Sequence, residues 1–235
     1  MKLTPAVRAW IGCVAFLVLV KLAFIAAPDL FYGDSRMALF DWPSIAIIGL
    51  AGLVGVLLAQ RTGFPEPSLR PFGERLLAPI AIGAALGALG VLLDLVGGGT
   101  KIFLAESGLA RFNMPLPASL VFYPGGAIFV EVAYRLLPIP LLLWLVSNVA
   151  LRGRWREQTF WVLAVLTSAI EPLSQETSAL PHGVLLFAGL FGLGYAFNFA
   201  QAVFFRRSGF LASIVVRLGY YAVWHILYGD LICRC

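Results

Sequence analysis

Residues 118–150 read ASLVFYPGGAIFVEVAYRLLPIPLLLWLVSNVA, which is long enough for a helix to cross a lipid bilayer, since a crossing takes about 20 mostly apolar residues. Glu131 and Arg135 interrupt the middle of this stretch. They are four residues apart, so on a helix they share one face and can pair. Each ionised side chain at a helix centre costs roughly 2.5–3.5 kcal/mol on insertion scales. The stretch therefore predicts either a structural ion pair or a polar pocket inside the membrane.

The composition of the whole chain points to lipid as its solvent. Of 235 residues, 60% are hydrophobic and 12% are charged, and the mean hydropathy is +0.91. Soluble domains carry about 25% charged residues. We therefore expect an all-α fold, a polytopic membrane helix bundle that forms a single transmembrane domain over residues 1–235. About seven transmembrane helices are predicted, near residues 9–27, 43–60, 76–96, 118–150, 159–178, 182–205 and 209–229.

The basic residues predict how these helices are oriented. Cytoplasmic loops of membrane proteins are enriched in Lys and Arg. One side of the predicted bundle holds ten of them: Lys2, Arg8, Arg61, Arg70, Arg75, Arg152, Arg154, Arg156, Arg206 and Arg207. The opposite side holds Arg36, Lys101, Arg111 and Arg234. We expect a cytoplasmic N-terminus and a C-terminus outside, and we attribute the net charge of +5 to these loops. The expected partner is the lipid bilayer, and binding to nucleic acid is not expected.

Small residues recur along the third predicted span. Gly and Ala let two membrane helices approach closely. The residues concerned are Gly83, Ala84, Gly87, Ala88 and Gly90. We interpret them as a helix-packing surface.

Two further acidic residues lie in or beside the fifth predicted span. Glu171 and Glu176 flank Pro172, and a proline kinks or ends a helix. Glu171 is predicted to need a polar partner. Glu176 either joins it or is solvated in an outer loop.

The remaining candidates are a histidine at the start of the sixth span and a polar row in the last one. Arg217, Tyr221 and His225 are spaced by four residues, so they lie near one helix face. An intramembrane Arg must face protein or water, and Glu171, Glu176 and Glu131 are its possible partners. His225 is either part of this pocket or a packed residue of an aromatic belt. His182 is either a pocket residue or an interfacial hydrogen-bonding residue.

Residues 118–228 resemble the CAAX protease and bacteriocin-processing (CPBP, or ABI) family of integral membrane proteins. The resemblance is carried by VEVAYR at 130–135 and RRSGFLASIVV at 206–216. The family's Glu-Glu-x-x-x-Arg motif places Glu131 and Arg135 at its second Glu and its Arg, with Val130 in place of the first Glu. In its Phe-x-x-x-His motif, His182 matches the histidine and Ser178 replaces Phe.

The family's third motif, His-x-x-x-Asn, falls near Arg217 and Tyr221, with His225 one turn later. The resemblance implies an intramembrane endopeptidase of a bacterial inner membrane that cleaves a membrane protein or peptide. Glu131 would be the general base, His182 its partner, and His225 or Arg217 the oxyanion donor.

No cofactor or metal is expected, because the chain has no H-E-x-x-H motif and only two histidines. Two alternatives stay open. Because Val130 replaces the water-activating Glu, the chain can be a non-catalytic pseudoprotease that acts as a membrane scaffold or binding partner. The other alternative is a small transporter.

Overall fold

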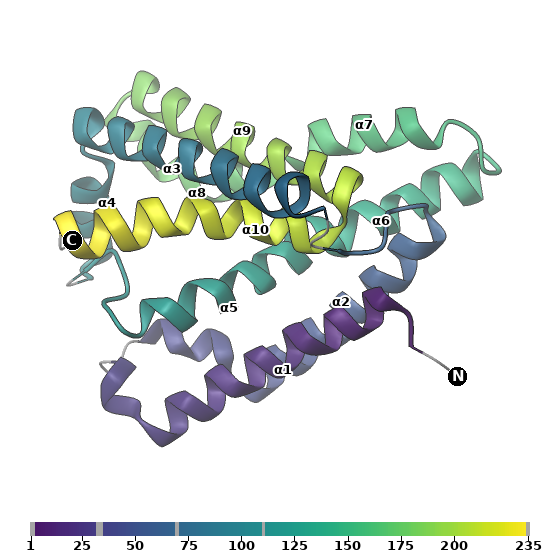
Figure 1. Cartoon of the computed structure of the whole chain (residues 1–235). Helices are drawn as coiled ribbons and strands as arrows, with labels where there is room; N and C mark the ends of the chain where they lie inside the picture. The colour runs from purple at the N-terminus through teal and green to yellow at the C-terminus, as the bar shows by residue number, and fades with distance from the viewer. Residues whose placement is uncertain (1–2, 32–34, 69–70, 110, 234–235) are drawn as a thin grey trace.

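The computed structural model describes residues 3–31, 35–68, 71–109 and 111–233. Within these ranges every regular element is helical (Figure 1). The α-helices are α1 (Pro5–Ala26), α2 (Trp42–Arg61), α3 (Ala78–Gly97), α4 (Gly99–Ser107), α5 (Ser119–Glu131), α6 (Pro138–Leu143), α7 (Arg156–Thr167), α8 (Ile170–Glu176), α9 (Val184–Ser208) and α10 (Phe210–Tyr221).

Helical segments with tighter or wider turns connect or extend these helices. The tighter 3₁₀ turns are η1 (Pro28–Phe31), η2 (Ser35–Phe40) and η6 (Thr177–His182). The wider π-type turns are η3 (Gly73–Leu77), η4 (Val132–Leu136), η5 (Trp144–Ala150) and η7 (Ala222–Cys233). Thus α5, η4, α6 and η5 form one long, apolar helical rod over Ser119–Ala150.

The protein is an all-α polytopic membrane helix bundle, as predicted. Six helical stretches in the described ranges are long and apolar enough to cross a bilayer: Pro5–Ala26, Trp42–Arg61, Gly73–Gly97, Ser119–Ala150, Val184–Ser208 and Phe210–Cys233. Each coincides with a predicted span.

The predicted span at 159–178 differs, because it is divided between α7 and α8 with a break at Ser168 and Ala169. Pro172 is the reason: it has no N–H to donate to the carbonyl four residues earlier. At the end of α7 the hydroxyls of Thr167 and Ser168 also donate to the carbonyls of Leu163 and Ala164. The expected kink therefore falls one turn before the proline.

The rod over Ser119–Ala150 lies in the middle of the bundle. On one side α5 contacts α10, which itself packs against α3 and α9. On the other side α5 contacts α1, and α2 contacts η4 and α6 (Figure 1). The centre of the rod, with Glu131 and Arg135, is consequently surrounded by other helices.

The glycines among the small residues of α3 are buried, and Gly83 and Gly87 pack directly against the backbone of α10, as predicted, whereas Ala88 is exposed. A Cβ atom on Gly87 would lie 2.9 Å from the carbonyl oxygen of Tyr220. On α10, a Cβ on Gly219 would lie 2.5 Å from the carbonyl oxygen of Ile80 on α3. The two backbones can approach this closely only because both sides lack side chains.

Successive long helices run in opposite directions and define two faces (Figure 1). We call the face where α1 begins the N-face and the face where η7 ends the C-face. Of the basic residues counted above, Arg8, Arg61, Arg75, Arg152, Arg154, Arg156, Arg206 and Arg207 belong to the N-face, and Arg36, Lys101 and Arg111 to the C-face. Lys2, Arg70 and Arg234 lie outside the described residues.

Candidate functional site

A buried polar network joins the long rod to α8, α9 and α10. Its charged members are two glutamates and two arginines: Glu131, Arg135, Glu171 and Arg217, each at most 4% exposed. The four charges sum to zero, which is the arrangement that a low-dielectric interior favours.

The strongest contact of the network joins Arg217 to Glu171. The two Nη atoms of Arg217 donate to the two carboxylate oxygens of Glu171 at 2.9 and 2.6 Å. This two-pronged geometry is the most specific that Arg and a carboxylate can adopt. Arg217 also donates to the Tyr221 hydroxyl and to Gln201 Oε1, both at 3.1 Å. The structure therefore selects Glu171 from the three partners considered for Arg217.

The second half of the network is built around Arg135. Its Nε donates to Glu131 Oε2 at 2.9 Å, and its Nη1 donates to Asn198 Oδ1 at 2.5 Å. The Ser213 hydroxyl donates to the same Glu131 oxygen at 2.7 Å. Arg135 Nη1 also lies 3.8 Å from Glu171 Oε2. Glu171 thus faces both arginines and links the two halves.

The network leaves some buried hydrogen-bonding capacity unused. Four buried atoms have no hydrogen-bond partner among the described residues: Glu131 Oε1, Arg135 Nη2, Gln201 Nε2 and Arg217 Nε. A buried polar atom without a partner costs free energy. The network is therefore not arranged for maximum stability alone.

The two histidines have other partners. His182 Nε2 lies 2.6 Å from Glu106 Oε1 on α4, and both side chains are partly exposed on the C-face. His225 Nδ1 lies 2.6 Å from Asn113 Oδ1, and its ring stacks on Tyr123 with centroids 4.3 Å apart. The aromatic surroundings considered for His225 are present. The structure does not bring His182, His225 and Glu131 into one hydrogen-bonded group.

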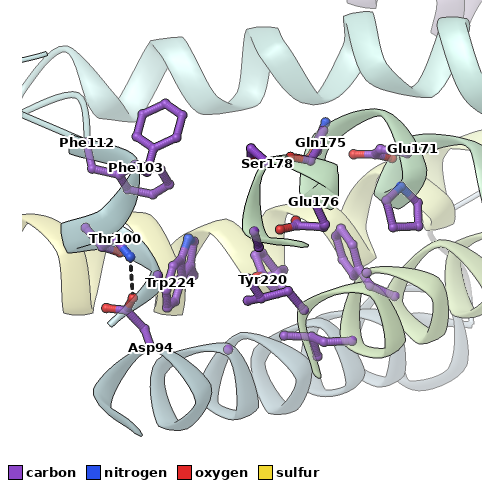
Figure 2. A pocket seen from close by; sticks show the side chains of 18 of the residues that line it. Asp94, Thr100, Phe103, Phe112, Glu171, Gln175, Glu176, Ser178, Tyr220 and Trp224 are labelled. Atoms are coloured by element: carbon purple, nitrogen blue, oxygen red, sulfur yellow. Dashed lines mark hydrogen bonds between the residues drawn. The ribbon is translucent and has the colours of Figure 1, made fainter. Parts of the chain in front are cut away.

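A cavity of about 430 Å³ lies beside the network, between α3, α4, α8, α9 and the α10–η7 helix. Of the predicted site residues, five line it: Glu171, Glu176, Arg217, Tyr221 and His225. Figure 2 shows the cavity with Asp94 and Thr100 at one end and Glu171 at the other. Glu131, Arg135 and His182 are not among the lining residues. The predicted site thus separates into a buried network and a cavity that meet at Glu171 and Arg217.

Sequence reasoning missed Asp94, which is buried at the end of α3. Its carboxylate accepts the Thr100 backbone N–H at 2.6 Å and the Tyr228 hydroxyl at 2.9 Å. The sequence did point to Asp94, since an acidic residue at the end of an apolar span is a functional candidate by default. Asn198 and Gln201 were missed too, although amides in the apolar sixth span carry the same kind of signal.

Within the described ranges, no group of three or more His, Cys, Asp and Glu side chains is arranged to hold a metal ion. Comparisons of the chain with protein-family models, curated proteins and solved structures find no match.

Proposed function

We propose that this chain is a non-catalytic integral membrane protein that binds a small molecule in the cavity beside its buried ion-pair network. The observation that carries the proposal is the ion pairing of the buried glutamates. Glu131 and Glu171 are both held by arginines. A carboxylate that serves as general base must instead be within hydrogen-bond reach of the water molecule from which it takes a proton.

The cavity supports a binding role. Its volume of about 430 Å³ falls within the roughly 300–1,000 Å³ of small-molecule pockets. Apolar and aromatic side chains form most of its wall, and polar and charged side chains also converge on it, so it offers both the apolar surface and the orienting polar groups that small-molecule pockets use. The network holds α8, α9 and α10 together, so it fixes the shape of the wall.

The proposal keeps the predicted setting. The chain would be a pseudoprotease related to the CPBP family, in a bacterial inner membrane with its N-face in the cytoplasm. The cavity would then open on the outer side, because exposed lining residues such as Glu106, Gln175 and Ser178 lie towards the C-face.

A second candidate is the intramembrane endopeptidase that the resemblance implies. One observation favours it: Glu171, Glu176 and His225 line a single cavity, and a carboxylate with an imidazole can act as general base and acid. A membrane protein or peptide would be its substrate.

One experiment separates the two candidates. Membranes from cells that produce wild-type protein, Glu131→Gln, His182→Ala, His225→Ala or no protein are compared by mass spectrometry of protein N-termini. The binding proposal expects the same cleavage products in all five. A product that requires the wild-type chain and disappears in His225→Ala or Glu131→Gln would replace it with the endopeptidase.

The binding arm uses the protein released from membranes and analysed by native mass spectrometry. We expect a bound small molecule on the wild type and none on Ser178→Trp, which places an indole at an exposed position of the cavity wall. Glu157→Gln on the N-face is the matched control and should retain the molecule. Identical spectra for wild type and Ser178→Trp would contradict the proposal.

A further inference from the structure

We infer that the cavity takes an amphipathic organic cation, that is, an amine or quaternary onium group carried on an apolar body. This inference rests on the proposed binding function and names its ligand class. It is carried by the charge balance of the cavity wall, the rings that form it and the contacts that occupy its one guanidinium.

The charge balance of the wall is negative. The described lining residues include four carboxylates, on Asp94, Glu106, Glu171 and Glu176, and one guanidinium, on Arg217. Arg217 neutralises Glu171, and Glu106 contacts His182 at the surface. The other two carboxylates, on Asp94 and Glu176, have no basic partner: no described Lys, Arg or His forms an ion pair with either.

These two carboxylates differ in how much bonding capacity remains. Asp94 already accepts the Thr100 N–H and the Tyr228 hydroxyl, both of which stabilise its negative charge. Glu176 is the last residue of α8, is only partly buried and accepts no hydrogen bond among those found in the described chain. Glu176 is therefore the lining carboxylate with the most unused capacity to pair with a cation, and Asp94 adds a second negative charge farther along the wall.

The wall between the carboxylates is aromatic. In Figure 2 the rings of Trp224 and Tyr220 lie between Asp94 and Glu171, and their centroids are 6.5 Å apart. Phe103, Phe112, Phe197 and Tyr221 complete the aromatic part of the lining, next to the His225 imidazole. A cation within about 6 Å of a ring centroid is attracted by the negative face of the ring. Rings also accept an apolar body, so they favour an organic cation over a metal ion.

An anionic ligand is disfavoured by the same geometry. Arg217 is the one guanidinium of the described wall, and both of its Nη atoms are engaged by Glu171. The one Arg217 donor without a partner in the described chain, Nε, is itself buried. A phosphate or carboxylate could therefore reach an Nη atom only by displacing Glu171 and leaving it buried without its partner, which is strongly unfavourable. A carboxylate on the ligand would also be repelled by Glu176.

The test uses two probes of matched shape and opposite charge, tetraphenylphosphonium and tetraphenylborate, in equilibrium binding to the purified full chain. We expect the wild type to bind the phosphonium at least roughly tenfold more tightly than the borate. Glu176→Gln should weaken phosphonium binding roughly tenfold, since it removes one ion pair from a largely desolvated site. Trp224→Leu should weaken it severalfold through the lost ring.

Two controls keep the outcomes separate. Glu157→Gln, on the N-face, should bind the phosphonium as the wild type does. Ser178→Trp should abolish binding, and residual binding to it measures partition of the probe into detergent. Folding of each variant is checked by its unfolding transition in detergent.

The results distinguish failure of this inference from failure of the proposed function. Equal affinity for both probes, or unchanged phosphonium affinity in Glu176→Gln, would overturn the cation assignment while the cavity remained a binding site. If neither probe binds and native mass spectrometry also finds no bound molecule on the wild type, the proposed binding function falls as well.

Discussion

The residue that organises the interior is Arg217. A lone guanidinium in a lipid-embedded helix is costly, yet this one is 3% exposed and has three polar partners, Glu171, Tyr221 and Gln201. The ring of Phe197 covers its guanidinium, with the centroid 4.8 Å from Cζ. Its contacts therefore come from α8, α9 and its own helix, so one side chain ties three elements together.

Breaking this pair should destabilise the protein strongly. In Arg217→Met the Glu171 carboxylate loses its bidentate partner while it stays buried, and an uncompensated buried charge costs about 3–5 kcal/mol. In the double variant Glu171→Leu and Arg217→Met both charges are gone, and we expect most of that loss to be recovered. The free energy of unfolding, from a denaturing-detergent titration followed by circular dichroism, measures both effects.

The matched control is the exposed pair of Glu157 and Arg206, whose atoms approach to 2.6 Å with the Glu157 side chain 55% exposed. Glu157→Gln should cost at most about 1 kcal/mol, because surface pairs are screened by water. Equal losses in Arg217→Met and Glu157→Gln would show that burial does not strengthen the Arg217 pair.

At the scale of elements, α3 and α10 pack backbone against backbone. A Cβ on Gly83 would overlap the carbonyl oxygen of Val216, and Gly87 and Gly219 are similarly crowded. This contact carries Arg217 on α10 and Asp94 on α3 to opposite parts of the same cavity. A shift between the two helices would therefore change the site as well as the packing.

Gly83→Ala should lower the free energy of unfolding by about 1–3 kcal/mol, because the new methyl meets backbone atoms and forces the helices apart. The matched control is Gly192→Ala on α9, where nothing lies within 4 Å of the added Cβ. That variant should be neutral or slightly stabilising, since alanine favours a helix over glycine by about 1 kcal/mol. The same denaturing-detergent titration applies, and equal tolerance of both substitutions would argue against close packing of α3 on α10.

At the scale of the whole molecule, the helices separate charge between the two faces. Most of the basic side chains belong to the N-face, including Arg152, Arg154 and Arg156 in one loop, whereas the cavity with its carboxylates lies towards the C-face. Positive loops are retained in the cytoplasm. With the N-face in the cytoplasm, as proposed, the acidic cavity would open to the outside.

Single-cysteine labelling tests this orientation. In a background of Cys13→Ala, Cys233→Ser and Cys235→Ser, a membrane-impermeant maleimide applied to intact cells should label Ser107→Cys on the C-face. Arg154→Cys on the N-face should react only after the membrane is permeabilised. The reverse pattern would place the cavity in the cytoplasm.

Much of this molecule could be predicted from its sequence. Hydropathy alone identified lipid as the solvent and located the six long helices, because burial in a bilayer is decided by about 20 consecutive residues. Pro172 predicted the break in the fifth span, and the glycines of α3 predicted a close contact with another helix. These are local properties, which a helix expresses wherever it is placed.

The spacing of Glu131 and Arg135 on one helix already predicted their pair, but only the tertiary structure decided which charges on different helices meet. Three glutamates were possible partners for Arg217, and the depth and rotation of α8 against α10 selected Glu171. The same rotations turned His225 towards Asn113 and placed His182 beside Glu106, and they brought Asp94 into the wall of a shared cavity. Pairing between side chains on different helices depends on how those helices are turned toward one another, and no pattern within a single helix specifies that.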